Sequence, residues 1–553
     1  PIYTEALVAS LLINLFALAS PLFVMNVYDR VVPNHALETL WVLAIGVIIV
    51  YAFEFIMKSL RGYFIDVAGK RSDIILSATI FEKVLGIKME SRPASVGAFA
   101  NNLHEFESFR DFLTSATLTT LIDLPFLFIF LAVIYMLGGD LALIPLIVLP
   151  LAICTGIAIQ KPLKNTINEL FQFSAQKGAI LIESLTNLDS IKCNGAEGQM
   201  QKYWEQNIGQ IARLSLKSRF FSSMAVNFTV FLQHLAYVAV VIYGVYKISD
   251  GDLTTGGLIA CTILTNRALA PVAQVASLLT RYHSAKASLN ALNTMMALPV
   301  EREPGKKFLH RPTFEGNIEF KNISFSYPDQ PIKALDNISF KINAGERVGF
   351  IGRIGSGKST IEKLMMGLYQ PDDGSILIDG TDIRQLDPSD LRRQIGYVPQ
   401  DISLMFGSAK DNITLGSRFA DDTAILRAAE ITGVTNFVNR HPAGFDLPVG
   451  ERGSALSGGQ RQSVAVARAL LLSPPIFIMD EPSNSMDNST EEAFKQRFSS
   501  QLNTQTLILV THRASLLTLV DRLIVMDGSK IVADGPKEKV LEALKQGQIK
   551  VSG

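Results

Sequence analysis

Apolar runs long enough to cross a membrane fill most of the chain before residue 285. A helix needs roughly 20 residues to span about 30 Å of hydrocarbon, and in lipid it satisfies its own backbone hydrogen bonds. The runs lie at 5–26, 39–57, 115–137, 140–160, 222–247 and 254–280. They predict a membrane α-helical bundle of six transmembrane helices over residues 1–285.

The connections between these runs alternate between short and very long. The stretches 58–114 and 161–221 are long, and they carry most of the Lys and Arg of this half. Positive residues favour the cytoplasmic side of a membrane. We therefore expect both stretches in the cytoplasm, where short helices such as 101–112 would receive force from the second half of the chain.

Polar residues inside the expected spans are costly in hydrocarbon and tend to face a cavity or a partner. Examples are Asp123 in the third span, Gln233 in the fifth and Arg267 in the sixth. Arg267 either pairs structurally or lines a path through the membrane, and the sequence leaves both possibilities open.

Residues 313–553 have the mixed composition of a soluble α/β domain, and 286–312 read as a linker between the two parts. The chain has 553 residues, which is too long for one core. Its 51 basic and 51 acidic side chains balance, so charge gives no reason to expect nucleic acid as a partner.

A glycine-rich loop follows a short apolar run at 347–351. The loop fits the pattern G-x-x-x-x-G-K-S/T and reads Gly352, Arg353, Ile354, Gly355, Ser356, Gly357, Lys358, Ser359, Thr360. Such a loop surrounds phosphates with backbone N–H groups, and the following helix adds its positive end. Lys358 would neutralise the β- and γ-phosphates of ATP, and the Ser359 hydroxyl would bind Mg²⁺. An α/β phosphate-loop NTPase domain is therefore predicted behind the membrane bundle.

A second apolar run, 475–479, ends in two carboxylates. Asp480 can hold Mg²⁺ through water, and Glu481 can polarise the water that attacks the γ-phosphate. Either motif alone would also suit an ordinary core strand, but the two together indicate ATP hydrolysis.

The run Ser457, Gly458, Gly459, Gln460 follows Leu456 and opens a helix-like segment. Together with the phosphate loop and Asp480-Glu481, this order of motifs resembles the ATP-binding cassette family over essentially all of residues 313–553. The resemblance implies that Tyr327 stacks on adenine and that Gln400 links Mg²⁺ to the membrane domain. It also implies that His512 contacts the γ-phosphate and that Asp487 communicates between paired sites. Glu481, His512 and Gln400 would then be the catalytic residues.

Two departures from the family pattern occur. Thr511 stands before His512 where many exporters have Ala, and residues 483–487 read Ser-Asn-Ser-Met-Asp in place of the commoner Thr-Ser-Ala-Leu-Asp. Neither change removes a group that does chemistry, so hydrolysis is expected to survive.

In this family the glycine-rich signature of one subunit closes over ATP held by another subunit. A chain with one membrane domain and one cassette is thus half a transporter, and a symmetric homodimer with two equivalent sites is the simplest assembly.

The runs 21–33, 109–113 and 121–126 resemble the inner-membrane ATPases of bacterial type I secretion systems, especially those exporting large adhesins and repeat toxins. The resemblance implies a periplasmic adaptor, an outer-membrane channel and an unfolded protein as cargo. It is also consistent with a peptidase-like domain upstream of Pro1. The alternatives are a lipid, drug or peptide exporter, and an ATP-gated channel or regulator.

Overall fold

The computed structural model describes residues 2–547 except 94, 96, 98, 100–108, 110, 111, 113–115, 304, 418 and 503. Most of the expected helix at 101–112, and Arg110, Asp111 and Leu113 of the run 109–113, lie outside the described residues. The chain divides into two compact units. One contains residues 1–85 and 93–298, and the other contains residues 86–92 and 299–553.

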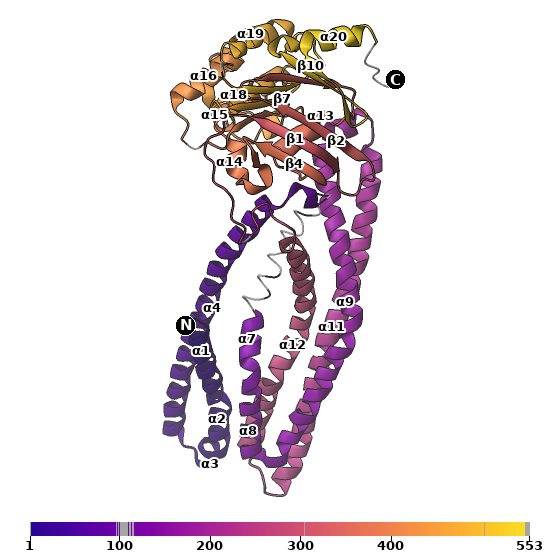
Figure 1. The fold of residues 1–553 in the computed structure, drawn as a ribbon. Coiled ribbons are helices and arrows are strands. Elements are labelled where there is room, and N and C mark those ends of the chain that lie inside the picture. The colour runs from indigo at the N-terminus through magenta and orange to yellow at the C-terminus, as the bar shows by residue number, and fades with distance from the viewer. Residues whose placement is uncertain are drawn as a thin grey trace. The chain divides into compact units, whose positions relative to one another are not determined.

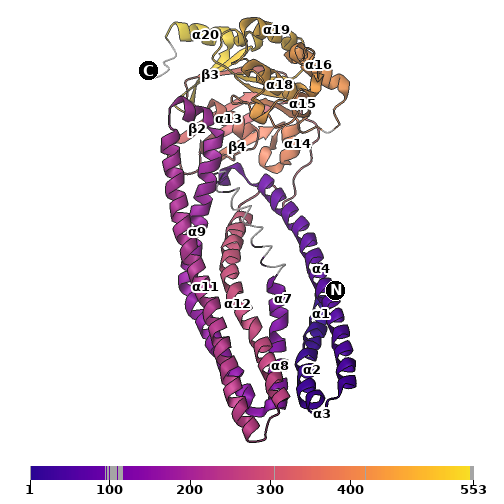
Figure 2. The ribbon, with the colours of Figure 1, turned by 180° about the vertical axis from the view of Figure 1, so that it is seen from behind.

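The first unit is helical throughout its described part. Its elements are α1 (Ile2–Phe16), α2 (Ala19–Asn26), the π-helical turn η1 (Val27–Val31), α3 (Val32–Asn34), α4 (Leu37–Gly86), α7 (Ala116–Asp123), η3 (Leu124–Phe126), α8 (Leu127–Gly138), η4 (Gly139–Ala142), α9 (Leu143–Thr186), α10 (Leu188–Cys193), α11 (Glu197–Ser249) and α12 (Thr255–Met296). Helices α9 and α11 lie alongside one another over most of their length (Figures 1 and 2). α12 continues to Met296, so the first part of the expected linker 286–312 is helical.

The expected count of six spans is not confirmed. In the part of the chain that the structure describes, four helical runs are long and apolar enough to cross a membrane: 7–34, 37–86, 124–186 and 197–249. The run 124–186 joins the expected third and fourth spans through the short turn η4. The expected sixth span, 254–280, lies in α12, which is not one of these four runs.

The apolar centre of this unit lies where α8, α11 and α12 meet. Ile134, Val240 and Leu264 are fully buried there. The helices approach closely because Gly244 has no side chain: a Cβ on it would lie 2.2 Å from the Leu258 Cδ1 atom. A larger residue at 244 would therefore push α11 away from α12.

Asp123, which the sequence placed inside a span, has partners on two other helices. Arg61 of α4 donates to its Oδ1 at 3.0 Å, and Asn14 of α1 donates to the same oxygen at 3.1 Å. The Arg61 guanidinium also donates to Ser10 Oγ at 2.9 Å. The carboxylate is thus paired, which is what a charge in an apolar setting requires. Gln233 donates to the carbonyl oxygen of Leu269 at 2.7 Å and joins α11 to α12.

Asp29, in the π-helical turn η1, binds the beginning of α12. Its carboxylate accepts hydrogen bonds from Thr254 Oγ1 at 2.6 Å and from the Gly256 N–H at 2.8 Å. It thereby satisfies one of the free N–H groups at the positive end of the helix, that of Gly256. Gly256 allows the approach, because a Cβ there would lie 2.5 Å from the carbonyl oxygen of Met25.

The second unit contains two sheets flanked by helices. Its strands are β1 (Ile318–Ser326), β2 (Lys333–Ile342), β3 (Arg347–Gly352), β4 (Asp373–Ile378), β5 (Thr381–Asp382), β6 (Ile395–Val398), β7 (Ile476–Asp480), β8 (Thr506–Val510), β9 (Arg522–Asp527) and β10 (Lys530–Pro536). Its helices and turns are η2 (Met89–Ser91), α13 (Lys358–Met365), η5 (Ile383–Gln385), α14 (Pro388–Arg393), α15 (Ala409–Ile413), α16 (Asp422–Thr432), α17 (Thr435–Val438), η6 (Gly444–Asp446), η7 (Glu451–Gly453), α18 (Gly458–Leu470), α19 (Asn488–Ser499), η8 (Leu516–Leu519) and α20 (Lys537–Lys545).

Among the described residues, one sheet is antiparallel with the order β2-β1-β4-β5, and the larger one has the order β10-β9-β3-β8-β7-β6. Strands β3, β8, β7 and β6 of the larger sheet are mutually parallel. Every residue of β7 and β8 is buried, as expected for parallel strands covered on both faces.

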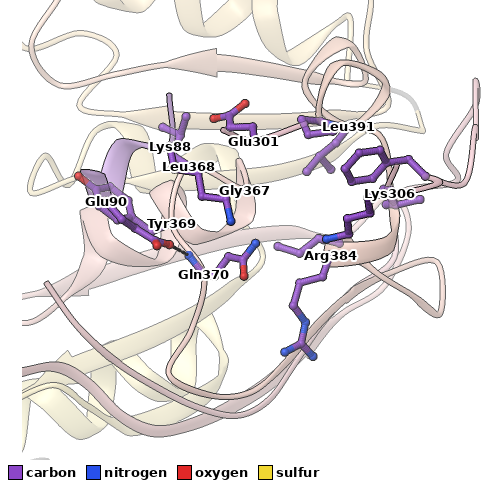
Figure 3. A pocket seen from close by; sticks show the side chains of 14 residues that line it. Lys88, Glu90, Glu301, Lys306, Gly367, Leu368, Tyr369, Gln370, Arg384 and Leu391 are labelled. Atoms are coloured by element: carbon purple, nitrogen blue, oxygen red, sulfur yellow. Dashed lines mark hydrogen bonds between the residues drawn. The ribbon is translucent and has the colours of Figure 1, made fainter. Parts of the chain in front are cut away.

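The segment 86–92 is part of this second unit and packs against residues that follow α12. Ile87 forms an antiparallel bridge with Val300, and the Glu301 N–H donates to the carbonyl oxygen of Gly86 at 2.8 Å. Glu90 accepts a hydrogen bond from the Gln370 N–H at 3.0 Å, drawn as a dashed line in Figure 3. The pocket in that figure has a volume of about 50 Å³, which is too small for a nucleotide.

Candidate nucleotide site

The order of the parallel strands brings four separate motifs to one edge of the larger sheet. The glycine-rich loop follows β3, Thr511 and His512 follow β8, Glu481 follows β7, and Gln400 follows β6. Because β3, β8, β7 and β6 are neighbours in that order, their carboxyl ends present these residues side by side. Ligands of open α/β sheets bind at this edge.

The glycines of the loop permit a backbone that other residues would adopt only with strain. Gly352 has φ of 154°, and a Cβ on it would lie 2.2 Å from the Met526 carbonyl oxygen. Gly357, with φ of 100°, directly precedes α13, and a Cβ there would lie 2.6 Å from the Ala334 carbonyl oxygen. The loop therefore keeps its turn and leaves the amino end of α13 open to an anion.

Lys358 is the first residue of α13 and is only 8% exposed. Its ammonium group donates to the carbonyl oxygens of Gly352 at 2.8 Å and Arg353 at 2.7 Å. Burial lowers the pKa of this amine, and the nearby carboxylates of Asp480 and Glu481 oppose that shift. The cation is thus held inside the loop, where phosphate oxygens would meet it.

Ser359 and Asp480 form the oxygen pair that a magnesium ion would use. The Ser359 hydroxyl donates to Asp480 Oδ2 at 3.1 Å. Burial raises the pKa of the Asp480 carboxyl, and the hydrogen bond from Ser359 acts in the opposite direction. Burial also raises the pKa of Glu362 to about 9, and the nearby charge of Asp480 acts in the same direction.

Glu481 is held by several bonds in an uncommon backbone conformation. Its φ is 48°, in the left-handed region, and its side chain is 7% exposed. One carboxylate oxygen accepts a hydrogen bond from the His512 N–H at 2.6 Å, and the other accepts one from Thr511 Oγ1 at 3.1 Å. Residues after β8 therefore fix the direction of the Glu481 carboxylate. Strain of this kind is commonly found at functional positions.

A cavity of about 460 Å³ collects most of the predicted site. Its lining includes Tyr327, Ile354, Gly355, Ser356, Gly357, Lys358, Ser359, Thr360, Gln400, Asp480, Glu481 and His512. Gly352 and Arg353 line an adjoining hollow with His512. The Tyr327 hydroxyl lies 3.1 Å from Thr360 Oγ1, which ties the aromatic ring to the phosphate loop.

The signature run and Asp487 lie elsewhere in the same unit. Ser457 caps α18, and its side chain and that of Gln460 hydrogen-bond each other's backbone N–H groups, as in a capping box. Of the described residues, neither Ser457 to Gln460 nor Asp487 lines the 460 Å³ cavity. Ser457 and Asp487 are both exposed to solvent.

Three side chains that no sequence motif marks hold the turn after Glu481. Gln462 donates to the Glu481 carbonyl oxygen at 2.6 Å. Glu491 accepts from the Ser483 hydroxyl at 2.6 Å, and Arg513 donates to Glu491 at 2.5 Å. None of the three belongs to a motif that binds phosphate, so only their proximity in sequence to such motifs could have drawn attention to them.

Comparisons with known proteins identify the family. The model of the ABC transporter transmembrane region matches residues 3–272, and the ABC transporter model matches residues 335–484. The chain belongs to the ABC transporter family. Its ATPase unit couples ATP hydrolysis to transport, and its membrane unit makes it a multi-pass membrane protein.

Curated relatives place this ABC transporter among translocation ATPases. It is 35% identical over 545 residues to the leukotoxin translocation ATP-binding protein LktB of Mannheimia haemolytica, covering 98% of this chain and 76% of the relative. It is 34% identical, with the same coverage, to the exotoxin translocation ATP-binding protein PaxB of Pasteurella aerogenes. A bacterial Atm1-family ABC exporter solved with ATP bound has the same fold, with a TM-score of 0.88, 23% identity, and coverage of 100% of this chain and 99% of that one.

The Thr511 hydroxyl offers a direct test of the site geometry. Thr511→Ala should lower kcat for ATP hydrolysis by roughly 10- to 100-fold, because a hydrogen bond to a charged group contributes about 1.5–3 kcal/mol, and it should leave KM unchanged. Thr511→Ser keeps the hydroxyl and should retain the parent kcat. Steady-state hydrolysis by the purified transporter measures both variants. A Ser variant as impaired as the Ala variant would contradict a role for the hydroxyl.

Proposed function

We propose that this ABC exporter works as a homodimer that moves an unfolded protein out of a bacterial cell in a type I secretion system. Support for ATP-driven movement comes from the single sheet edge that gathers the phosphate loop, Asp480-Glu481 and Thr511-His512. Support for a protein cargo comes from the relatives, whose names describe translocation of leukotoxin and exotoxin.

In this proposal, ATP lies in the 460 Å³ cavity with its phosphates in the loop 352–360. Lys358 binds the β- and γ-phosphates, and Tyr327 stacks on the adenine. The signature run Ser457 to Gln460 would contact the ATP held by the partner subunit, which agrees with its place outside the cavity of its own chain. The amino end of α18 is suited to this because its free N–H groups attract phosphate.

The residues at the site fit Mg²⁺ as the metal that accompanies ATP. Ser359 and Asp480 offer hard oxygen ligands 3.1 Å apart, and Gln400 lines the same cavity. Mg²⁺ prefers oxygen ligands and commonly takes only one or two from the protein besides phosphate and water. When bound, the ion neutralises phosphate charge.

The chain's own residues would do the rest of the chemistry. Glu481 accepts a proton from the attacking water and so polarises it, while the bonds from Thr511 and His512 hold its carboxylate in place. His512 is exposed in the cavity and would contact the γ-phosphate. Lys358 stabilises the charge on the phosphate oxygens as the terminal bond breaks.

The expected setting is the bacterial inner membrane with the cassette in the cytoplasm, where ATP is available. A periplasmic adaptor and an outer-membrane channel would continue the path outward. The main competing function is export of a lipid, drug or peptide, which the common exporter fold also permits.

Deletion in the native host tests this function. Loss of the gene should remove a large protein from the culture medium and leave that protein inside the cells. The parent gene should restore secretion, whereas a Glu481→Gln gene should not. An unchanged set of secreted proteins, with altered lipid composition or drug resistance, would favour the alternative.

A further inference from the structure

Gln462 is a buried glutamine whose side-chain amide connects two segments at the ATP site. It lies in the second turn of α18, beyond the signature run, and is 2% exposed. Its Nε2 donates to the carbonyl oxygen of Glu481 at 2.6 Å, and its Oε1 accepts from the Ser485 N–H at 2.7 Å. One amide therefore bonds both ends of the turn 481–485, which leads into Asp487.

Close packing reinforces this connection at the start of α18. A Cβ on Gly459 would lie 2.9 Å from the Ser485 carbonyl oxygen, and one on Gly458 would lie 3.1 Å from the Ser485 Cβ. The two signature glycines thus let the helix rest directly on the turn. A displacement of α18 would be transmitted to Ser485 because no gap separates them.

The Glu481 backbone needs such support. With φ of 48°, it adopts a conformation that costs a glutamate on the order of 1 kcal/mol or more unless its surroundings hold it. Its N–H donates to the Val510 carbonyl oxygen at 2.9 Å, and its carbonyl accepts from Gln462. β8 and α18 therefore hold opposite sides of the residue that carries the reactive carboxylate.

We propose that Gln462 is a positioning residue that links docking of the signature helix on one ATP to the placement of Glu481 at the other ATP site. The inference rests on the proposed homodimer, in which α18 faces the ATP of the partner subunit and Glu481 serves the ATP of its own chain. Occupancy of one site then improves the geometry of the other through a single side chain.

Three variants separate a positioning role from loss of stability. Gln462→Leu should lower kcat by roughly 10-fold with KM for ATP unchanged, because both backbone groups lose their buried partner. Gln462→Glu can donate to the Glu481 carbonyl only when protonated, so its activity relative to the parent should exceed that of Gln462→Leu and should not fall as the pH is lowered from 9 to 6. Asn412→Leu is the matched control, since Asn412 is a fully buried amide bonded to Met405 and Ser408 away from the cavity.

Equal kcat values for Gln462→Leu and Gln462→Glu at every pH would overturn the inference. So would a kcat for Asn412→Leu as low as that of Gln462→Leu at the same melting temperature, because the effect would then follow stability alone.

Mixed dimers show which ATP site Gln462 serves. Gln462→Leu and Glu481→Gln are placed either on the same chain or on different chains of a linked dimer, so that both dimers contain the same lesions. Single-turnover hydrolysis then measures the rate at the one ATP site that keeps Glu481. The split arrangement should be slower by roughly 10-fold, because its only intact Glu481 lies beside the altered Gln462. Equal or reversed rates would overturn the proposal, whereas normal turnover by a Glu481→Gln homodimer would instead remove Glu481 from the proposed function.

Discussion

Glu481→Gln should lower steady-state ATP hydrolysis by roughly 10²- to 10⁴-fold while nucleotide affinity stays at the parent value. The glutamine keeps the size of the side chain but cannot take a proton from water. Binding should survive because the phosphate loop, Lys358 and Ser359, which would contact the nucleotide from the end of β3 and from α13, are unchanged. Steady-state turnover and nucleotide binding, measured on the same preparation, test the two halves of this prediction.

The matched control is Glu492→Gln on α19. Glu492 is an exposed carboxylate paired with Lys495 at 2.5 Å, and it lies outside the cavity lining. This variant should hydrolyse ATP at the parent rate. Turnover of Glu481→Gln within a few-fold of the parent would show that another group activates the water.

Lys358→Ala should instead weaken nucleotide binding by roughly 10- to 100-fold, because a hydrogen bond to a charged group contributes about 1.5–3 kcal/mol. The ammonium lies inside the loop and donates to the Gly352 and Arg353 carbonyl oxygens, so its removal also takes away the donor to those two oxygens. Turnover should fall as a consequence at ordinary ATP concentrations. Equilibrium binding of a labelled nucleotide measures the effect.

Lys358→Arg and Lys410→Ala complete that experiment. Arginine keeps the charge but presents a planar fork that the narrow loop does not match, so it should restore affinity only in part. Lys410 pairs with Asp422 on the surface at 3.1 Å, and its removal should leave affinity unchanged. Parent affinity in Lys358→Ala would rule out the assigned role.

The membrane helices could be predicted as elements but not in length. Apolar runs marked the parts of α4, α9 and α11 that are apolar enough to cross hydrocarbon, yet α4 continues to Gly86 and α9 to Thr186. Hydropathy falls when a helix leaves lipid, whereas a helix ends only where backbone hydrogen bonding ends. The pairing of Asp123 with Arg61 was also beyond the sequence, because α4 and α7 meet only through tertiary packing.

At the nucleotide site, too, some residues could be predicted from the sequence and others became evident only from the fold. Lys358, Asp480 and Glu481 were predicted as site residues and line the cavity. Each belongs to a short motif that spans a single turn between a strand and the following loop. Thr511 was noticed only as a departure from the family pattern, although its hydroxyl contacts Glu481. Gln462 could not be predicted as a site residue from the sequence, because glutamine is common inside helices. Its role depends on the turn after Glu481, which only the fold brings into contact with it.

The hydrogen bond between Asp29 and Thr254 joins residues that are 225 positions apart, and this separation affects how the membrane unit is made. At a synthesis rate of about 5–20 residues per second, the carboxylate waits roughly 10 to 45 s for its partner to leave the ribosome. During that interval the first helical run, which contains most of α1 and all of α2 and η1, lies in the bilayer without the start of α12. The contact between η1 and α12 is therefore among the last to form in the membrane unit, and a chain that stops before Gly256 lacks the Gly256 N–H bond to Asp29.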